Sequence, residues 1–347
     1  MNKDIKLNNV KGLLIFLVVF GHLLSPFRKN SIELYLFIYS FHMPLFILLS
    51  GYFAKRASFK KVINLVLLYL IFQPLCREYS VLLHPGKIFK FKYEVPYFQL
   101  WYLVSMIAWY LIAIGINYLK LNKYQKVALV MGCFAIGIAS KYFTEPVVDM
   151  MKYYDSKFYS YTFSYQRTLS FLPFFILGLV LTEDTMIKLY QSLKAKWIVV
   201  VAAIAGIFTY YHVTSTTNQI KILKGSYGVY EMKGALPHTT TVILIGYVIA
   251  IVMCYVILNV SGSKNNILTK WGERSLPIFL FHSFFVMYLK RLSFFNGLNF
   301  AVLLGLLIVI SVIINVILSS DLFVKCTYYL CNPVEMVKLF PRRYKTA

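Results

Sequence analysis

The sequence has 347 residues, of which 59% are hydrophobic, 18% are aromatic and 14% are charged, and its mean hydropathy is +0.66. Soluble domains carry roughly 25% charged residues, and a globule of this length has too small an interior to hide so much apolar surface. A soluble protein is therefore excluded, and we expect an all-α integral membrane protein. The net charge of +23 then predicts basic loops and lipid headgroup contacts, with no nucleic-acid partner.

Ten apolar stretches are candidate transmembrane helices. In chain order they are 12–27, 34–53, 62–83, 97–119, 127–143, 169–182, 197–213, 240–260, 275–289 and 300–318. The sixth and the ninth are short and contain Pro173 and Pro277, which favours helices that are tilted or broken. We expect about ten spans, to within one.

Lys and Arg in the early loops indicate the orientation, because cytoplasmic loops carry an excess of these residues. They precede the first span and follow the second and the fourth: Lys3, Lys6, Lys11, Lys55, Arg56, Lys60, Lys61, Lys120, Lys123 and Lys126. Both termini are therefore expected in the cytoplasm. No loop has room for a second soluble domain, so we expect one domain over 1–347, with a core at about 8–320 and a basic cytoplasmic tail at 321–347.

Polar residues at membrane depth are the informative ones, because each costs a few kcal/mol to insert. His22 lies in the first span, eleven residues or about three helical turns after Lys11, so the two share one face about 16 Å apart along the axis. This indicates either a polar path inward from the cytoplasm, or a topogenic lysine and a histidine that bonds a neighbouring helix.

His42 in the second span and His282 in the ninth are likewise at depth. His42 is expected at the level of His22, where two imidazoles would handle protons or simply bond to core hydroxyls. Pro44 is expected to kink the second span, and Ser50-Gly51 permits a close helix approach. Almost no carboxylate lies at depth and the five cysteines form no CxxC, so we expect no metal site.

Three further residues are candidates for substrate binding. Trp101 opens the fourth span with other aromatic residues, either as a sugar-stacking surface or as an ordinary aromatic belt. Arg167 precedes the sixth span, where an anionic substrate or a lipid phosphate would meet it. Arg274 stands beside an expected helix start at Ser275, which is either an anion site or an ordinary helix start.

Taken together, these segments resemble the acyltransferase-3 family of membrane O-acyltransferases. KGLLIFLVVFGH, from Lys11 to His22, resembles the first-helix motif, FHMPLFILLSGY the second-helix signature, and GERSLPIFLFH a late segment of the family. LWYL and R-x-x-x-FLPFFILG resemble the fucose 4-O-acetylase-like branch, which includes bacterial polysaccharide O-acetyltransferases. The resemblance runs from residue 8 to 289 and agrees with ten spans.

The resemblance implies a multi-pass enzyme of the bacterial cell membrane. It would transfer an acetyl group from cytoplasmic acetyl-CoA, a donor substrate and not a bound cofactor, to a sugar hydroxyl of a surface polysaccharide, such as a capsule, or of its lipid-linked precursor. His22 matches the catalytic histidine, and Lys11 matches its basic partner, which is more usually Arg. The expected partners are acetyl-CoA, the carbohydrate acceptor and the lipid bilayer, with a homo-oligomer or a polysaccharide synthesis machinery compatible with this function.

Chemistry then gives the residues their roles. His22 would be the general base on the acceptor hydroxyl, Lys11 with the inner loop would bind the phosphates of CoA, and His42 and His282 would orient substrate. A transporter or flippase for a lipid-linked sugar could use the same spans, although no inverted repeat is visible. A scaffold of a synthesis complex is the third alternative.

Overall fold

The fold is helical throughout the residues that the computed structural model describes, which are 5–86, 88–89, 92–192, 196–214, 217–229, 236–295 and 297–332. No strand occurs among them. The α-helices are α1 Ile5–Leu24, α2 Ile32–Phe53, α3 Phe59–Leu82, α4 Trp101–Tyr118, α5 Lys123–Tyr142, α6 Thr144–Lys152, α7 Tyr165–Val180, α8 Glu183–Gln191, α9 Lys196–Thr214, α10 Thr217–Lys224, α11 Leu236–Val260, α12 Ile267–Glu273, α13 Ser275–Leu289, α14 Phe300–Leu318 and α15 Asp321–Cys331. Short 3₁₀ turns are η1 Ser25–Phe27, η2 Ala54–Arg56, η3 Phe98–Leu100, η4 Thr162–Ser164 and η5 Ser293–Phe295.

Each of the ten predicted stretches is largely helical in the structure, and the all-α fold class is confirmed. Among the described residues, seven helices are long and apolar enough to cross a membrane by themselves, and up to nine spans result if each of two bent helix pairs counts as one. The remaining predicted span, α13, is a shorter apolar helix of 15 residues. The chain is a multi-pass membrane protein, while the side of the bilayer on which the termini lie stays a prediction.

The two bent pairs are α5 with α6 and α7 with α8. The axes differ by 62° in the first pair and by 101° in the second. The second break occurs where Leu181 is extended and the Thr182 side chain accepts a hydrogen bond from the backbone of Thr185, which starts a new helix. The predicted short sixth span is therefore continuous through Pro173 and broken only after Val180.

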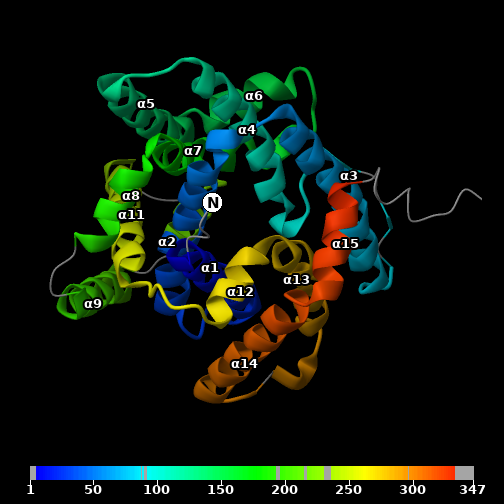
Figure 1. The fold of residues 1–347 in the computed structure, drawn as a ribbon. Coiled ribbons are helices and arrows are strands. Elements are labelled where there is room, and N and C mark those ends of the chain that lie inside the picture. Colours follow the sequence, from blue (N-terminus) through cyan, green and yellow to red (C-terminus); the bar gives the residue numbers. More distant parts are fainter. Residues whose placement is uncertain are drawn as a thin grey trace, which may run out of the picture.

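Helix α1 lies in the middle of the bundle and packs against α2, α12, α13 and α14 (Figure 1). Its tightest approach is to α12: a Cβ on Gly12 would lie 2.0 Å from the carbonyl oxygen of Leu268, and one on Gly272 would lie 1.9 Å from that of Asn8. Only glycine permits this backbone contact. It fixes α1, and with it His22, against the segment that leads into α13.

Helices α2 and α7 cross in the same way. A Cβ on Gly51 would lie 1.9 Å from the carbonyl oxygen of Phe175, and one on Gly178 would lie 1.9 Å from that of Leu48. The close approach predicted at Ser50-Gly51 is confirmed. The Ser50 hydroxyl also bonds the Tyr102 hydroxyl at 2.5 Å, which ties α2 to α4.

The outer helices present apolar side chains away from the core, as lipid-facing helices do. Helix α14 is apolar along nearly its whole length, yet only about a third of it is buried inside the protein. Beyond it, Asp321–Cys331 of the predicted tail form α15, which packs against α3 and α13. The tail from residue 333 onward lies outside the described residues.

Candidate active site

His22 lies near the end of α1 between two rings from distant parts of the chain. Its imidazole centroid is 5.4 Å from that of His282, with the rings nearly parallel at 22°, and 4.5 Å from the ring of Phe98. The structure shows no hydrogen bond from His22 to another described residue.

His282 is fully buried, with 0% of its surface exposed, in the middle of α13. Its Nδ1–H donates to the carbonyls of Phe279 at 2.8 Å and Ile278 at 3.1 Å. Because a carbonyl can only accept, the proton must be on Nδ1, and a neutral ring then carries a lone pair on Nε2. That buried Nε2 has no partner among the described residues, so it can accept a hydrogen bond near His22.

His42 has the same bonding pattern on α2. Its Nδ1–H donates to the carbonyl of Ile38 at 2.7 Å, and the Tyr39 ring is 4.8 Å away, edge-on. It lies within electrostatic range of His22. The imidazole that stacks on His22 is that of His282, and a shared role of His22 and His42 stays a prediction.

Lys11 lies toward the opposite end of α1. Its ammonium group is 5.4 Å from the centroid of the Phe53 ring and within electrostatic range of Glu273. The three turns of helix between Lys11 and His22 correspond to about 16 Å. Lys11 and His22 therefore lie toward opposite ends of one face of α1 and do not contact each other.

Trp101 and Arg167 pack on each other. The guanidinium carbon of Arg167 is 4.9 Å from the Trp101 ring centroid and 5.6 Å from that of Tyr161, both cation–π distances. Its Nη2 donates a long bond of 3.5 Å to the Ser226 hydroxyl, and its buried Nε has no partner among the described residues. Trp101 follows directly on Phe98–Leu100, so this pair adjoins the His22 site.

Arg274 does not join the histidines. Its Nη1 donates to the Ser319 carbonyl and to the Asp321 carboxylate, each at 2.7 Å, at the junction of α14 and α15. Helix α13 does begin at Ser275, and Arg274 lies at the end of that helix remote from Lys290. A role of Arg274 in substrate binding stays a prediction.

The segment before α4 holds Phe98 in a strained conformation. Its φ is +48°, in the left-handed region that bulky residues rarely adopt. Gln73 fixes the chain on one side, because its Nε2 donates to the Val95 carbonyl at 2.7 Å and its Oε1 accepts from the Tyr97 backbone at 2.8 Å. On the other side, Gln99 donates to the Ser283 hydroxyl at 2.7 Å, beside His282. Strain of this kind is typical of functional sites.

Sequence reasoning missed several residues of this site. Phe98, Gln99 and Ser283 contact the histidines or fix the segments that carry them, and Lys290 lies 4.8 Å above the Phe98 ring. None of them carries a signal in the sequence, because an aromatic residue or a lysine at the end of a span is ordinary in a membrane protein. Contacts of the η3 turn with α1 and with α13 bring them to His22.

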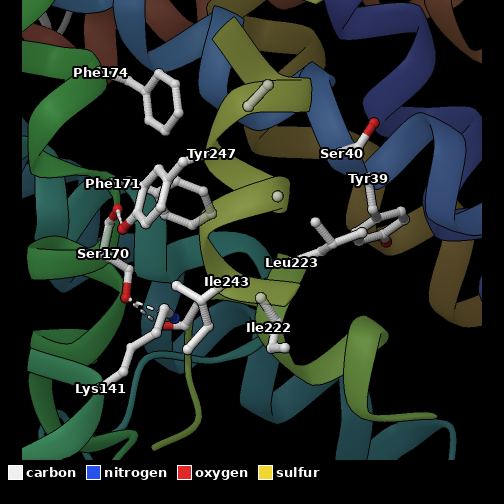
Figure 2. Close-up of a pocket in the computed structure, with 13 residues that line it drawn as sticks. Tyr39, Ser40, Lys141, Ser170, Phe171, Phe174, Ile222, Leu223, Ile243 and Tyr247 are labelled. Atoms are coloured by element: carbon white, nitrogen blue, oxygen red, sulfur yellow. Dashed lines mark hydrogen bonds between the residues drawn. The ribbon is translucent and has the colours of Figure 1, made fainter. Parts of the chain in front are cut away.

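A separate, largely apolar pocket lies among α2, α5, α7, α10 and α11 (Figure 2). One of its lining residues is Lys141, which is 2% exposed and donates to the Ser170 hydroxyl at 3.2 Å. Tyr39, which contacts His42, also lines it. Sequence analysis did not single out Lys141, because it stands at the end of a predicted span.

Within the described residues, His, Cys, Asp and Glu form no group of three that could hold a metal ion.

The sequence is similar to those of known proteins. A family model described as an acyltransferase domain, Acyl_transf_3, matches residues 4–320. Nodulation protein NolL of Sinorhizobium fredii is 44% identical over 73 residues, 18% of this chain and 20% of the relative. Nodulation protein NolL of Mesorhizobium japonicum is 38% identical over 73 residues, 17% of this chain and 18% of the relative. The matches thus span about a fifth of the relatives, and no solved structure matches the chain.

Proposed function

The chain belongs to the acyltransferase-3 family of membrane acyltransferases, and from that premise we propose that it transfers an acetyl group from acetyl-CoA to a sugar hydroxyl. The acceptor is a bacterial cell-surface polysaccharide or its lipid-linked precursor, and the enzyme works in the bacterial cell membrane. The observation that carries the proposal is the His22 imidazole, which lies between His282 and Phe98 and has no hydrogen bond to another residue that the structure describes.

The proposed step is direct transfer with His22 as general base. His22 takes the proton of the acceptor hydroxyl while the hydroxyl oxygen forms a bond to the acetyl carbonyl carbon. The carbon–sulfur bond of the thioester then breaks, and the CoA sulfur receives the proton from His22. The products are an O-acetyl ester and CoA with a free thiol, so atoms and charges balance and no further reactant is needed.

His282 and His42 orient the reactants in this proposal. The Nδ1–H of each histidine donates to a backbone carbonyl of its own helix. The lone pair on each Nε2 can therefore accept a hydrogen bond from a substrate hydroxyl or from the N–H of His22. At the other end of α1, Lys11 binds a phosphate of CoA as a point charge. Because Lys11 and His22 are about 16 Å apart along α1, the CoA chain must extend along this helix from the phosphate at Lys11 to the thioester at His22.

The test compares the protein with His22→Ala in lipid nanodiscs with acetyl-CoA and in cells that make the acceptor. We expect release of CoA thiol and glycan O-acetylation, seen by acetyl NMR signals, to fall about 10²- to 10⁴-fold, as for loss of a general base. His84→Ala is the matched control, because it removes an imidazole that follows α3, away from His22, and whose Nδ1–H donates to the Ser80 carbonyl at 2.8 Å.

Two results would contradict the proposal. Undiminished acetylation with His22→Ala present in the membrane would remove its catalytic role. Undiminished acetylation together with loss of the polymer from the cell surface would instead support the alternative of a transporter for a lipid-linked sugar.

A further inference from the structure

Four cationic side chains gather at the end of the bundle where α1 and α13 finish. Arg28 follows η1, Lys290 follows α13, Lys224 ends α10 and Arg167 lies in the first turn of α7. Lys290 is within electrostatic range of Lys224 and Arg28, and Lys224 is within range of Arg28 and Arg167. Packing alone assembles this cluster, because its members come from four separate elements.

The cluster has no acidic partner. In the part of the chain that the structure describes, none of the four forms an ion pair with Asp or Glu, and the nearby Glu33 pairs instead with His212 at 3.3 Å. Burial lowers the pKa of Lys224 to about 8, and the charges of Arg28 and Arg167 act in the same direction. Like charges that are held together without counter-charges repel one another, and a bound anion would relieve this repulsion.

The fold fixes the Arg28 side chain and the turn that follows Lys224. Arg28 donates to the Ser25 carbonyl at 2.9 Å, and the turn after Lys224 is fixed by a bond from the Ser170 hydroxyl to the Gly225 carbonyl at 3.1 Å. Gly225 has a φ of +69° and packs against Phe171, so another residue would be strained there. A preorganised cluster binds an anion without first ordering its side chains.

The cluster adjoins the proposed catalytic base. The Lys290 ammonium group lies over the Phe98 ring, which in turn contacts His22, and both Lys290 and Lys224 are within electrostatic range of His22. Arg28 follows His22 by six positions, just past the end of α1 and the η1 turn. An anion bound by the cluster would therefore lie at the same end of α1 as His22.

Aromatic rings beside the cluster favour a carbohydrate. The Arg167 guanidinium is sandwiched by cation–π contacts with Trp101 and Tyr161, and Lys221 lies over Tyr227 at 5.5 Å. Resting on the proposed acetyl transfer, we propose that the acceptor is an acidic glycan, whose carboxylate or phosphate binds Arg28, Arg167, Lys224 and Lys290 while a hydroxyl on the same or the next sugar faces His22. The phosphates of CoA are assigned to the other end of α1, at Lys11.

The first experiment identifies the acceptor. Surface glycans from cells with the wild-type protein and with His22→Ala are compared by mass spectrometry and NMR. We expect the repeat unit that loses acetyl groups to carry a carboxylate or a phosphate within one or two sugars of the acetylated hydroxyl. A neutral acceptor would overturn this inference but leave the acetyl transfer intact, whereas unchanged acetylation would overturn the proposed function itself.

The second experiment locates the anion site by kinetics in nanodiscs. With the de-O-acetylated glycan as acceptor, Lys224→Gln and Lys290→Gln should each raise the KM for glycan about tenfold, the worth of one charge-assisted hydrogen bond, and leave the KM for acetyl-CoA unchanged. Lys224→Arg and Lys290→Arg, which keep the charge, should restore most of the affinity. Arg291→Gln is the matched control, because Arg291 follows Lys290 directly and has no contact with the cluster among the described residues.

The chemical source of the anion is resolved with modified glycans. Reduction of carboxyl groups should raise the KM if the anion is a carboxylate, and removal of phosphate should raise it if the anion is a phosphate. If neither treatment changes the KM for glycan, or if the two lysine variants raise the KM for acetyl-CoA instead, the cluster does not bind the acceptor.

Discussion

At the scale of single residues, Lys141 stands out as a positive charge in apolar surroundings. Its side chain is buried, and the Ser170 hydroxyl is the hydrogen-bond partner that the structure gives its ammonium group. Replacing a poorly compensated buried charge by an apolar side chain of similar length is often neutral or stabilising. Lys141 therefore contributes little to the stability of the fold.

We predict that Lys141→Met raises the free energy of unfolding by about 1 kcal/mol, because it removes the cost of burying the ammonium group. Thermal unfolding in detergent measures this change. Lys152→Met is the comparison, because Lys152 is exposed and pairs weakly with Asp149. A lower melting temperature of Lys141→Met would show that the hydrogen bond to Ser170 outweighs the burial.

The sequence revealed the polar residues at membrane depth but not their partners. His22, His42 and His282 could be found because a histidine in an apolar run is conspicuous and costly. The partners could not be found, because Phe98 and Lys290 look like ordinary residues at the end of a span. The place of Arg274 beside a helix start favours a substrate-binding role in the sequence, yet in the structure its guanidinium donates to the Ser319 carbonyl and to the Asp321 carboxylate.

At the scale of elements, the segment that leads into α4 contains a residue, Phe98, that has a strained backbone and also contacts His22. Phe98 and Phe163 both have a positive φ, of 48° and 47°, but only the Phe98 ring contacts His22. The Phe163 side chain is 56% exposed. Comparing substitutions of the two residues therefore distinguishes the effect of the strained backbone, which both share, from the effect of the ring on the site, which only Phe98 has.

We predict that Phe98→Asn lowers the rate of acetyl transfer at least about tenfold, because the ring that positions His22 is lost. The free energy of unfolding should change little, because two effects oppose each other. The variant loses the packing of the Phe98 ring, but Asn tolerates the left-handed region and so relieves strain of about 1–3 kcal/mol. Phe163→Asn relieves the same strain and should leave the transfer rate unchanged. Equal effects of the two variants on the rate would show that the Phe98 ring does not contribute to the site.

The helix crossings give a prediction about assembly of the bundle. Because a Cβ on Gly178 would lie 1.9 Å from the Leu48 carbonyl oxygen, Gly178→Ala must push α7 away from α2. We expect a loss of about 3 kcal/mol or more of unfolding free energy. Gly132→Ala on α5, where nothing lies within 4 Å of the new Cβ, should instead gain about 0.5–1 kcal/mol. Unfolding by heat distinguishes the two.

At the scale of the whole molecule, long apolar runs predicted the positions and the order of the long helices well, since a lipid solvent leaves few other choices for the backbone. The bend at α5–α6 was not predicted, and the break expected in the sixth span lies after Val180 rather than at Pro173, because such bends depend on one or two loop residues such as Thr182. The glycine crossing of α1 and α12 was also missed. Glycines in apolar helices are common, and only the structure shows which of them lie at a crossing.

The charge distribution over the molecule predicts a pH dependence. Lys290 is exposed on one side, but partial burial of its ammonium group over Phe98 lowers its pKa to about 8, and Lys224 and Arg28 act in the same direction. Lys224 has a pKa of about 8 as well and faces Arg28 and Arg167. Both lysines are charged below this pH and lose their protons above it, so anion binding weakens as the pH rises.

We therefore predict that the KM for an acidic glycan rises between about pH 8 and 9.5, beyond any change in the KM for acetyl-CoA. Bound anion shifts the rise upward, because it stabilises the charged lysines. The double variant with Lys224→Gln and Lys290→Gln should have a high KM that no longer depends on pH in this range. A KM for glycan that falls with pH in the wild-type protein would contradict the assignment.

The short helix α13 has a further consequence for the membrane around it. Its 15 residues rise about 22 Å, whereas the hydrocarbon core of a bilayer is about 30 Å thick. His282 stands at its middle, about 10 Å from either end. We expect the bilayer to thin around the protein at both ends of α13, which would bring the two aqueous phases closer together at the depth of the histidines than elsewhere in the membrane.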